Sequence, residues 1–263
     1  MKLWLGDRLV EEDAARISPF DRGFTLGDGL FETLRLAGGA VLRLDAHLAR
    51  LAAGAGVLGI PLPALDLGAA LLATAQANRL ADGVLRLTLT RGAGPRGVLP
   101  PAAPTPTLVI TAAPAGPALP PARLVVAQTT RRNARSPLAQ VKSLNYLDGI
   151  LARQEAARRG ADDAVLLNTE ERVAETTIAN VFAVIDGALV TPPVADGALP
   201  GVMRAAVLSE GAEARALDAF DLAQADEIFL TSALGIRSVS EIEGRTLSVF
   251  TAAARLRTRI AGA

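Results

Sequence analysis

Hydrophobic and polar positions along the chain follow two different periods. Alternation with a period of two predicts strands in the first part of the chain at 2–5, 29–36, 40–43, 84–90 and 107–111. A period near 3.6 predicts two helices between these strands, one from Asp45 as a candidate N-cap to 57, the other from 64 to 80. Because strands and helices mix without strict alternation, the pattern favours an α+β fold.

A proline-rich segment divides the chain. Residues 112–122, AAPAGPALPPA, are too rich in proline for a helix or a central strand, so we interpret them as a linker. The sequence therefore predicts a small N-terminal α/β domain at 1–111 and a larger C-terminal domain at 123–263. For the second domain the pattern predicts strands at 123–128, 164–167, 181–185, 188–190 and 228–231, and helices at 145–159, 201–214 and 248–260.

Composition narrows the classes of function. The chain has 263 residues and a formal net charge of zero, so it lacks the basic footprint of a nucleic-acid binder. It has no cysteine and one histidine, His47, which excludes disulfides, thiolate sites and multi-histidine metal sites. No apolar run resembles a signal peptide or a membrane span. We therefore expect a cytoplasmic protein whose partners are small molecules, with no metal, nucleic acid or membrane.

Lysine is rare in this chain. Among the 27 basic residues only Lys2 and Lys142 are lysine. An amine can lose its proton and attack a carbonyl, whereas a guanidinium stays charged. Lys142 precedes a predicted helix, and apolar neighbours there would lower its pKa. Lys142 is thus a candidate nucleophile, with a surface lysine left by drift as the alternative.

Two further segments carry polar residues near predicted strands. In 21–35, DRGFTLGDGLFETLR, three glycines precede a strand on which Phe31, Thr33 and Arg35 share one face. In 91–97, RGAGPRG, the two arginines at the ends of a turn could bind a carboxylate. The alternative for both segments is an ordinary turn at the end of a strand.

Two more segments combine a charged residue with a predicted element. His47 and Arg50, three residues apart in HLARL, are neighbours on one helix face, and Arg50 could bind a phosphate. Glu175 lies in VAETTIANVF, a polar run that leads into an apolar strand. A solvated helix face and a surface acid are the corresponding structural alternatives.

The order of these motifs resembles that of a known family. DRGFTLGDGLFETLR, HLARL, RGAGPRG, VKSLNYLDGILARQEA, VAETTIANVF and LPGVMR occur in the order found in class IV aminotransferases, the fold type IV enzymes that use pyridoxal 5'-phosphate (PLP). The resemblance extends from about Trp4 to Val239. It implies two α/β domains with the active site in the cleft between them, and a homodimer.

The resemblance also implies roles for individual residues. Lys142 would hold PLP as a Schiff base and move protons on the substrate, and Glu175 would keep the pyridine nitrogen protonated. Arg50 would bind the cofactor phosphate, and Tyr146 would reach the phenolic oxygen of the ring. The backbone amides that would share the phosphate are those of Val202, Met203, Ala233 and Leu234.

The residues expected on the substrate side are similar to those of lyase members. Phe31 to Arg35 reads Phe-Glu-Thr-x-Arg, and 91–97 reads Arg-Gly-x-Gly-x-Arg-Gly. The resemblance thus implies a 4-amino-4-deoxychorismate lyase, which eliminates pyruvate to leave 4-aminobenzoate, with Phe31 and Thr33 at the substrate and with Arg96 and Arg35 on its carboxylates. The alternative is a D-amino-acid aminotransferase, followed by branched-chain or amine transamination and by a catalytically silent homologue.

Overall fold

The computed structural model describes residues 1–260, and the chain forms two compact units. Unit 1 comprises Met1–Pro117 together with Val141–Asn145, and unit 2 comprises Ala118–Gln140 and the chain from Tyr146 onward. The boundary falls inside the predicted linker, but the connection is shorter than predicted. Residues 112–114 belong to a strand of unit 1, and residue 122 begins a strand of unit 2.

The segment that contains Lys142 packs with unit 1, whereas the sequence analysis assigned it to the C-terminal domain. The reason is backbone pairing. The N–H of Phe31 donates to the carbonyl of Lys142 at 3.0 Å, and the N–H of Leu144 donates to the carbonyl of Gly29 at 3.0 Å. The chain therefore returns to the first sheet for five residues after it has entered the second unit.

Unit 1 is built on a six-stranded antiparallel sheet with the strand order β2-β1-β6-β5-β3-β4. Its strands are β1 (Lys2–Leu5), β2 (Arg8–Glu11), β3 (Gly29–Ala37), β4 (Ala40–Val41), β5 (Gly83–Thr90) and β6 (Thr107–Pro114), and its helices are α1 (Arg22–Leu26), α2 (Leu44–Leu58) and α3 (Leu67–Ala77).

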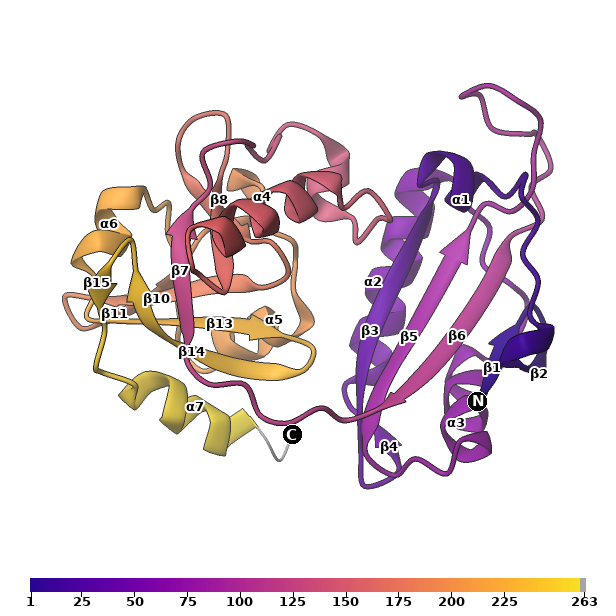
Figure 1. Cartoon of the computed structure of the whole chain (residues 1–263), viewed down its shortest axis with the longest axis horizontal. Coiled ribbons are helices and arrows are strands. Elements are labelled where there is room, and N and C mark those ends of the chain that lie inside the picture. The colour runs from indigo at the N-terminus through magenta and orange to yellow at the C-terminus, as the bar shows by residue number, and fades with distance from the viewer. Residues whose placement is uncertain (261–263) are drawn as a thin grey trace. The chain divides into compact units, whose positions relative to one another are not determined.

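The two faces of this sheet differ in character. One face is apolar and packs against α2 and α3, as Figure 1 shows, and its core includes Leu30 and Leu34 of β3 and Leu87 of β5. Phe31, Thr33 and Arg35 alternate with these residues and point to the other face, as the sequence pattern predicted. We call this other side the open face.

Unit 2 contains a nine-stranded mixed sheet, in which eight strands follow the order β12-β11-β10-β13-β14-β7-β8-β9 and β15 pairs with β14. The strands are β7 (Ala122–Val126), β8 (Asp163–Leu167), β9 (Val173–Thr176), β10 (Asn180–Ile185), β11 (Ala188–Thr191), β12 (Glu213–Ala214), β13 (Glu227–Ser232), β14 (Gly235–Ile242) and β15 (Arg245–Thr246). The helices are α4 (Leu147–Arg158), α5 (Val202–Leu208), α6 (Ala219–Gln224) and α7 (Thr251–Ile260).

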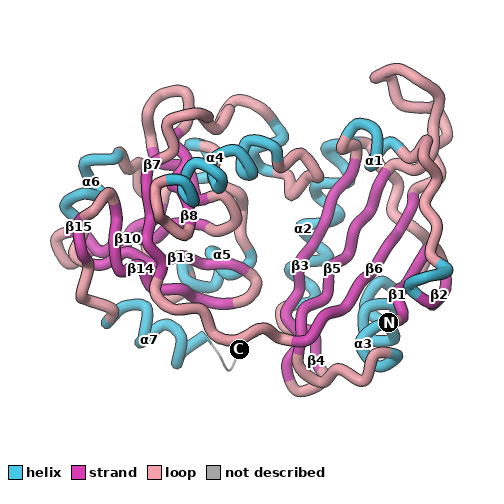
Figure 2. The backbone as a smooth tube through the Cα atoms, in the orientation of Figure 1, coloured by secondary structure: helices cyan, strands magenta, loops and turns pink. Residues whose placement is uncertain are grey.

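The central strands of unit 2 are buried on both faces. Val181 and Ala183 of β10 belong to one apolar core, whereas Phe182 packs in a second core with residues of α5 and α7. The ring of Phe182 stacks on that of Phe229 with the centroids 5.2 Å apart. Burial on both sides explains why these strands read as continuous apolar runs rather than as alternating patterns. Figure 2 shows the helices of this unit around its strands.

Several elements differ from the sequence predictions. The sequence analysis missed β2, α1, β9, β12, α6, β14 and β15, which are short or carry polar residues on both faces. Helix α2 begins at Leu44 after Arg43, so Asp45 lies in its first turn and is not the N-cap. Helix α5 ends at Leu208, well before the predicted residue 214. In residues 1–260, no helix combines the length and apolar character needed to cross a membrane.

Candidate active site

The side chain of Lys142 lies over an aromatic ring of the open face. Backbone hydrogen bonds to β3 hold the chain at this residue and at Leu144, and Lys142 is half-buried. Its Nζ is 4.3 Å from the centroid of the Phe31 ring. Phe31 itself is only 6% exposed, so the ring is a fixed surface for the amine.

A second cation contacts the same ring. The Cζ atom of Arg86, on β5, lies 3.8 Å from the Phe31 centroid. Arg86 is paired in register with Thr33 of β3, so the two side chains are neighbours on the open face. The structure thus brings Lys142, Phe31, Thr33 and Arg86 together. Sequence reasoning missed Arg86, because an arginine at an outward-facing strand position cannot be distinguished by pattern from an arginine that only contacts solvent.

Arg50 is held by a buried acid. Its Nε donates to Oε1 of Glu32 at 2.8 Å and its Nη2 donates to Oε2 at 2.6 Å. Nδ1 of His47 lies 2.7 Å from the same Oε2, and Glu32 is 1% exposed. Burial would raise the pKa of Glu32, but hydrogen bonds from His47 and Arg50 outweigh it and leave this pKa below its ordinary value. Glu32 is therefore an ionised carboxylate that fixes the plane of the Arg50 guanidinium.

The spacing of HLARL had placed His47 and Arg50 on one helix face, and their shared partner confirms it. Glu32 was missed, although the sequence carried a signal. It is the one acidic residue among the apolar positions of β3 that point toward α2.

The two arginines of RGAGPRG have different surroundings. Arg91 is buried, and its Nε donates to Oδ2 of Asp28 at 2.7 Å. It also donates to the carbonyls of Leu58 and Gly59 at the end of α2. The expectation that Arg91 binds a substrate carboxylate is therefore wrong, because its donors serve the fold.

Arg96 and Arg35 are both exposed. Arg96 lies in the connection between β5 and β6, and within residues 1–260 no hydrogen bond or ion pair links it to Phe31, Thr33 or Arg35. Arg35 lies near the end of β3, where burial and then the charge of Arg35 lower the pKa of Arg43.

In unit 2, Glu175 is surrounded by hydrogen-bond donors. Nη2 of Arg132 is 3.0 Å from Oε1, and the N–H of Leu199 donates to Oε2 at 3.0 Å. Nδ2 of Asn180 donates to the same Oε2 at 3.4 Å. Glu175 is 9% exposed. Three donors around a buried carboxylate stabilise its ionised form, so Glu175 is an anion that can receive a cationic N–H group. Arg132 and Asn180 were missed by sequence reasoning.

The N-terminus of α5 is tied to Glu175. Asn180 also donates from Nδ2 to the carbonyl of Leu199, two residues before Gly201, the N-cap of the helix. A Cβ atom at Gly201 would collide with Oδ1 of Asn180, so any larger residue there would displace the Asn180 side chain. The amides of Val202 and Met203 open the helix, where N–H groups have no partner within the helix.

Three other predicted residues lie at turns or helix ends of unit 2. Ala233 and Leu234 form the two-residue turn between β13 and β14, and the N–H of Leu234 donates to Oγ of Ser232 at 3.2 Å. Tyr146 is the half-buried N-cap residue of α4.

Arg204 lies in the first turn of α5, two residues after Val202. It is 6% exposed, and its Nε has no hydrogen-bond partner within residues 1–260.

Comparison with known proteins shows the family. The model of the family described as Amino-transferase class IV matches residues 29–242. A Methanocaldococcus jannaschii protein with the provisional name branched-chain-amino-acid aminotransferase is 37% identical over 94% of this chain and 90% of its own length. The D-alanine aminotransferase of Bacillus licheniformis is 31% identical over 94% of this chain and 90% of its own length.

Solved structures agree with this result. The 4-amino-4-deoxychorismate lyase of Pseudomonas aeruginosa is 35% identical, with a TM-score of 0.87 over 99% of this chain and 98% of its own. The branched-chain aminotransferase of Escherichia coli is 26% identical, with a TM-score of 0.92 over 99% of this chain and 93% of its own.

The chain belongs to the class IV aminotransferase family, and its two-sheet α+β architecture is that of the fold type IV enzymes. It is a PLP-dependent aminotransferase or lyase that acts on small amino or oxo acids.

The residues present fit this cofactor. Lys142 offers an amine for its carbonyl carbon, and Glu175 an ionised carboxylate for its pyridine nitrogen. Within unit 1, Arg50 is a guanidinium oriented by Glu32, and within unit 2 the first amides of α5 have no partner in the helix, so each unit carries donors of the kind that a phosphate needs. Arg204 adds a buried Nε–H without a partner in the described chain.

Proposed function

We propose that this enzyme is a 4-amino-4-deoxychorismate lyase. The observation that carries the proposal is the open face of unit 1, where Lys142 and Arg86 share the ring of Phe31 and Thr33 is paired with Arg86. An apolar ring flanked by an amine and a guanidinium suits a cyclic, unsaturated substrate that carries carboxylates. Arg35 and Arg96 are further cations of the same unit for the second carboxylate.

Each candidate residue then has a role. Lys142 holds the cofactor carbon and Glu175 keeps the pyridine nitrogen protonated through its ionised carboxylate. Arg50 binds the phosphate, together with the amides of Val202 and Met203. When bound, PLP withdraws electrons from the substrate carbon that bears the amino group. Tyr146, Ala233 and Leu234 remain assigned to the cofactor as the family resemblance implies.

The proposed reaction is an elimination. The amine of Lys142 takes the proton from the ring carbon that bears the amino group, and the bond between the ring and the enolpyruvyl oxygen breaks. The enolpyruvate takes up one proton and leaves as pyruvate, while the ring becomes aromatic as 4-aminobenzoate. Thr33, two positions after Phe31 on the same face of β3, assists this proton transfer through its hydroxyl group.

Similarity to a solved lyase supports this choice. The Pseudomonas aeruginosa lyase aligns over nearly the whole of both chains at 35% identity. The Phe-Glu-Thr-x-Arg pattern from Phe31 to Arg35 lies on β3, where Phe31 and Thr33 belong to the open face.

A second candidate is amino transfer. It is favoured by the 37% identity to the Methanocaldococcus jannaschii protein and the 31% identity to the Bacillus licheniformis D-alanine aminotransferase. In this alternative Arg86 and Arg96 bind the carboxylates of an amino acid and a 2-oxo acid, and Lys142 moves the proton between two carbons.

Three parallel assays distinguish these candidates. The purified enzyme with PLP is given 4-amino-4-deoxychorismate, D-alanine with 2-oxoglutarate, or L-leucine with 2-oxoglutarate. The lyase proposal predicts pyruvate and 4-aminobenzoate in equal amounts in the first assay. Rapid transfer in the second or third assay, with no pyruvate from the first, would instead make the enzyme a transaminase.

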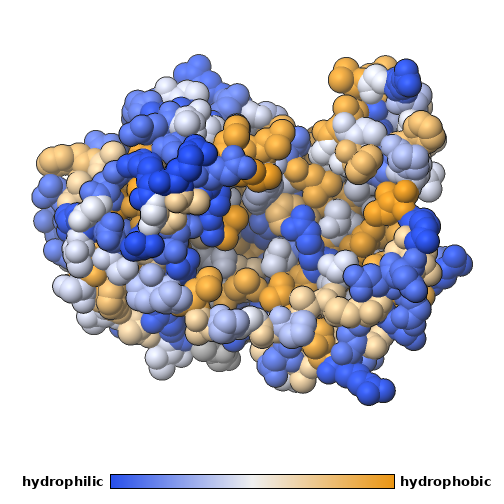
Figure 3. Space-filling view, viewed as in Figure 1, coloured by the Kyte–Doolittle hydropathy of each residue, from blue (hydrophilic) through white to orange (hydrophobic). Residues whose placement is uncertain are grey.

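We also propose that the enzyme is a homodimer. The exposed large apolar side chains of unit 1 include Phe20, Phe24, Val98 and Leu99. Figure 3 shows apolar atoms on the connection between β5 and β6, from which the last two come. Light scattering on the purified protein tests this: a mass of one chain would contradict it.

A further inference from the structure

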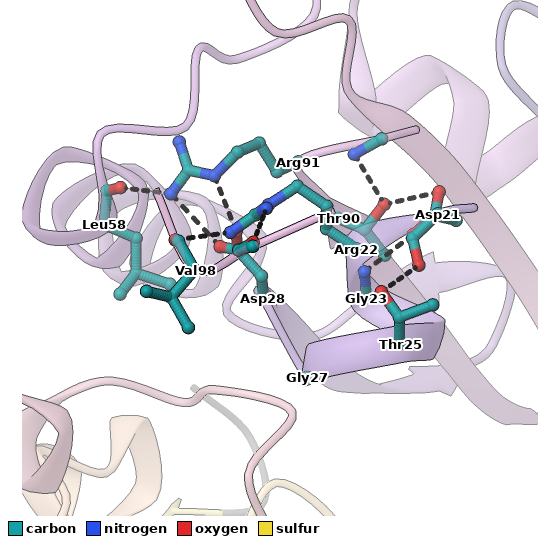
Figure 4. Close-up of polar contacts among 12 residues, drawn as sticks. Asp21, Arg22, Gly23, Thr25, Gly27, Asp28, Leu58, Thr90, Arg91 and Val98 are labelled. Carbon is teal, nitrogen blue, oxygen red and sulfur yellow. Dashed lines mark hydrogen bonds and ion pairs between the residues drawn. The ribbon is translucent and has the colours of Figure 1, made fainter. Parts of the chain in front are cut away.

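Arg22 binds the connection that carries Arg96. Arg22 lies in α1 and is 3% exposed. Its Nη1 donates to the carbonyl of Gly97 at 2.9 Å and its Nη2 donates to the carbonyl of Val98 at 2.8 Å. These carbonyls follow Arg96 directly in sequence. Figure 4 shows the guanidinium of Arg22 between Val98 and Asp28.

Asp28 fixes the orientation of Arg22. Its Oδ2 accepts from Nε of Arg22 at 2.8 Å and from Nε of Arg91 at 2.7 Å. Burial would raise the pKa of Asp28, but hydrogen bonds and charge from Arg91 and Arg22 outweigh it, so this pKa lies below its ordinary value. An ionised carboxylate thus holds two buried guanidinium groups, of which one faces α2 and the other faces the connection.

The neighbouring Asp21 closes the base of the same connection. Its Oδ2 accepts from Oγ1 of Thr90 at 2.9 Å and from Oγ1 of Thr107 at 2.7 Å. Thr90 is the last residue of β5 and Thr107 is the first of β6. Asp21 therefore ties together the two ends of residues 91–106, which we call the 91–106 loop.

We propose that Arg22 is a positioning residue for substrate binding, because it holds the backbone that follows Arg96 in one conformation. This inference rests on the proposed role of Arg96 in binding a substrate carboxylate. The loop itself offers little to fix that conformation: Arg96 is exposed, and Val98 and Leu99 are 84% and 82% exposed. Gly97, with a φ of 111°, adopts a backbone conformation that favours glycine.

The geometry requires an arginine at position 22. Its planar fork reaches two carbonyls and a carboxylate at once with three different nitrogens. A lysine has a single side-chain nitrogen and cannot contact three separate acceptors. Arg22→Lys should therefore lose part of the hold on the 91–106 loop, although the charge is kept.

The test compares Arg22→Met with Arg91→Met. Both replace a buried arginine that pairs with Asp28, and in each variant Asp28 keeps its other arginine. Only Arg22 contacts the carbonyls of Gly97 and Val98. Each PLP-loaded protein is first shown by circular dichroism to be folded. It is then treated with trypsin, and cleavage after Arg96 is followed by mass spectrometry.

We expect Arg22→Met to raise the rate of cleavage after Arg96 about tenfold, because two hydrogen bonds to the loop are lost. Arg91→Met should change it less than about twofold. Arg22→Met should also raise KM for the substrate about tenfold while kcat and the visible spectrum of the cofactor change little. Arg22→Lys should give intermediate values of both.

The outcomes separate two failures. Faster cleavage with an unchanged KM would show that Arg22 fixes the 91–106 loop but that Arg96 does not bind the substrate. The proposed role of Arg22 in substrate binding would then be wrong. A cleavage rate within about twofold of the wild-type rate would overturn the positioning role of Arg22, whatever reaction the enzyme catalyses.

Discussion

The carboxylate of Glu32 accepts two hydrogen bonds from Arg50, at 2.8 and 2.6 Å, and it is 1% exposed. The arginine assigned to the cofactor phosphate is therefore oriented before any phosphate binds. His47, the single histidine of the chain, lies 2.7 Å from the same carboxylate. The buried carboxylate of Glu32 thus orients the arginine that we propose as the phosphate ligand of unit 1.

Removing the charge of Glu32 should weaken both the fold and cofactor binding. Glu32→Gln leaves the half-buried Arg50 beside an uncharged partner, so we expect a loss of about 3 kcal/mol in the free energy of unfolding of the protein without PLP. The dissociation constant for PLP should rise about tenfold, because Arg50 loses its fixed orientation. Urea unfolding and a PLP titration measure these quantities.

Glu11→Gln is the control for this prediction. Glu11 forms an exposed ion pair with Lys2, so its loss should cost less than about 0.5 kcal/mol. Equally small losses in the free energy of unfolding from the two variants would show that Glu32 stabilises the protein no more than an exposed ion pair does.

Acid should destabilise the enzyme through Glu32 and Asp28. Hydrogen bonds from His47 and Arg50 outweigh burial at Glu32, and hydrogen bonds from Arg91 and Arg22 outweigh it at Asp28. The pKa values of both carboxyls therefore lie below the ordinary 4.5 and 3.8. The unfolded chain therefore takes up protons first, so this stabilisation is complete above the unfolded pKa values and is lost as pH falls through the lower folded ones.

Urea unfolding at a series of pH values between about 6 and 3 tests this. The free energy of unfolding should fall steeply in acid, and Glu32→Gln should show a shallower slope. Parallel curves for the two proteins would remove Glu32 from the acid response.

Glu175 should control rate rather than cofactor content. Glu175→Gln keeps a side chain of the same shape beside Arg132, but loses the negative charge that stabilises a protonated pyridine nitrogen. We expect the variant to retain its visible absorbance and to lose about 100-fold in kcat. Glu171→Gln, which removes an exposed partner of Arg131, is the matched control. An unchanged kcat would exclude Glu175 from the mechanism.

Arg86 should act on substrate affinity. Its guanidinium shares the Phe31 ring with Lys142, so Arg86→Gln removes a charge beside the reacting amine without emptying the core. We expect KM for the carboxylate substrate to rise about tenfold and cofactor binding to stay unchanged. Arg8→Gln, at an exposed position of β2, serves as the control. A KM equal to that of the wild type would mean that Arg86 does not bind the substrate and has only a structural role in the sheet.

Local pattern was enough to predict much of the fold. Alternation located β3 and placed Phe31 and Thr33 on one face, because one side of that sheet is buried and the other is open. The helix at 145–159 was also predicted, with Gly160 following it at a φ of 74°.

What pattern did not reveal depends on contacts between distant residues. Lys142 pairs with β3 more than 100 positions earlier, so no local signal could assign it to unit 1. Arg91 and Arg96 look alike in sequence, yet Asp28 and the end of α2 bury the first and leave the second exposed. The partners of Glu175 come from three separate segments for the same reason.

Chemical labelling can identify the lysine that binds the cofactor. The purified protein is mixed with PLP, its visible spectrum is recorded, and the protein is reduced with borohydride, digested and analysed by mass spectrometry. We expect a yellow protein with one pyridoxyl group on Lys142, and no such group in Lys142→Ala. A group on Lys2, or a colourless protein without any modification, would contradict this expectation.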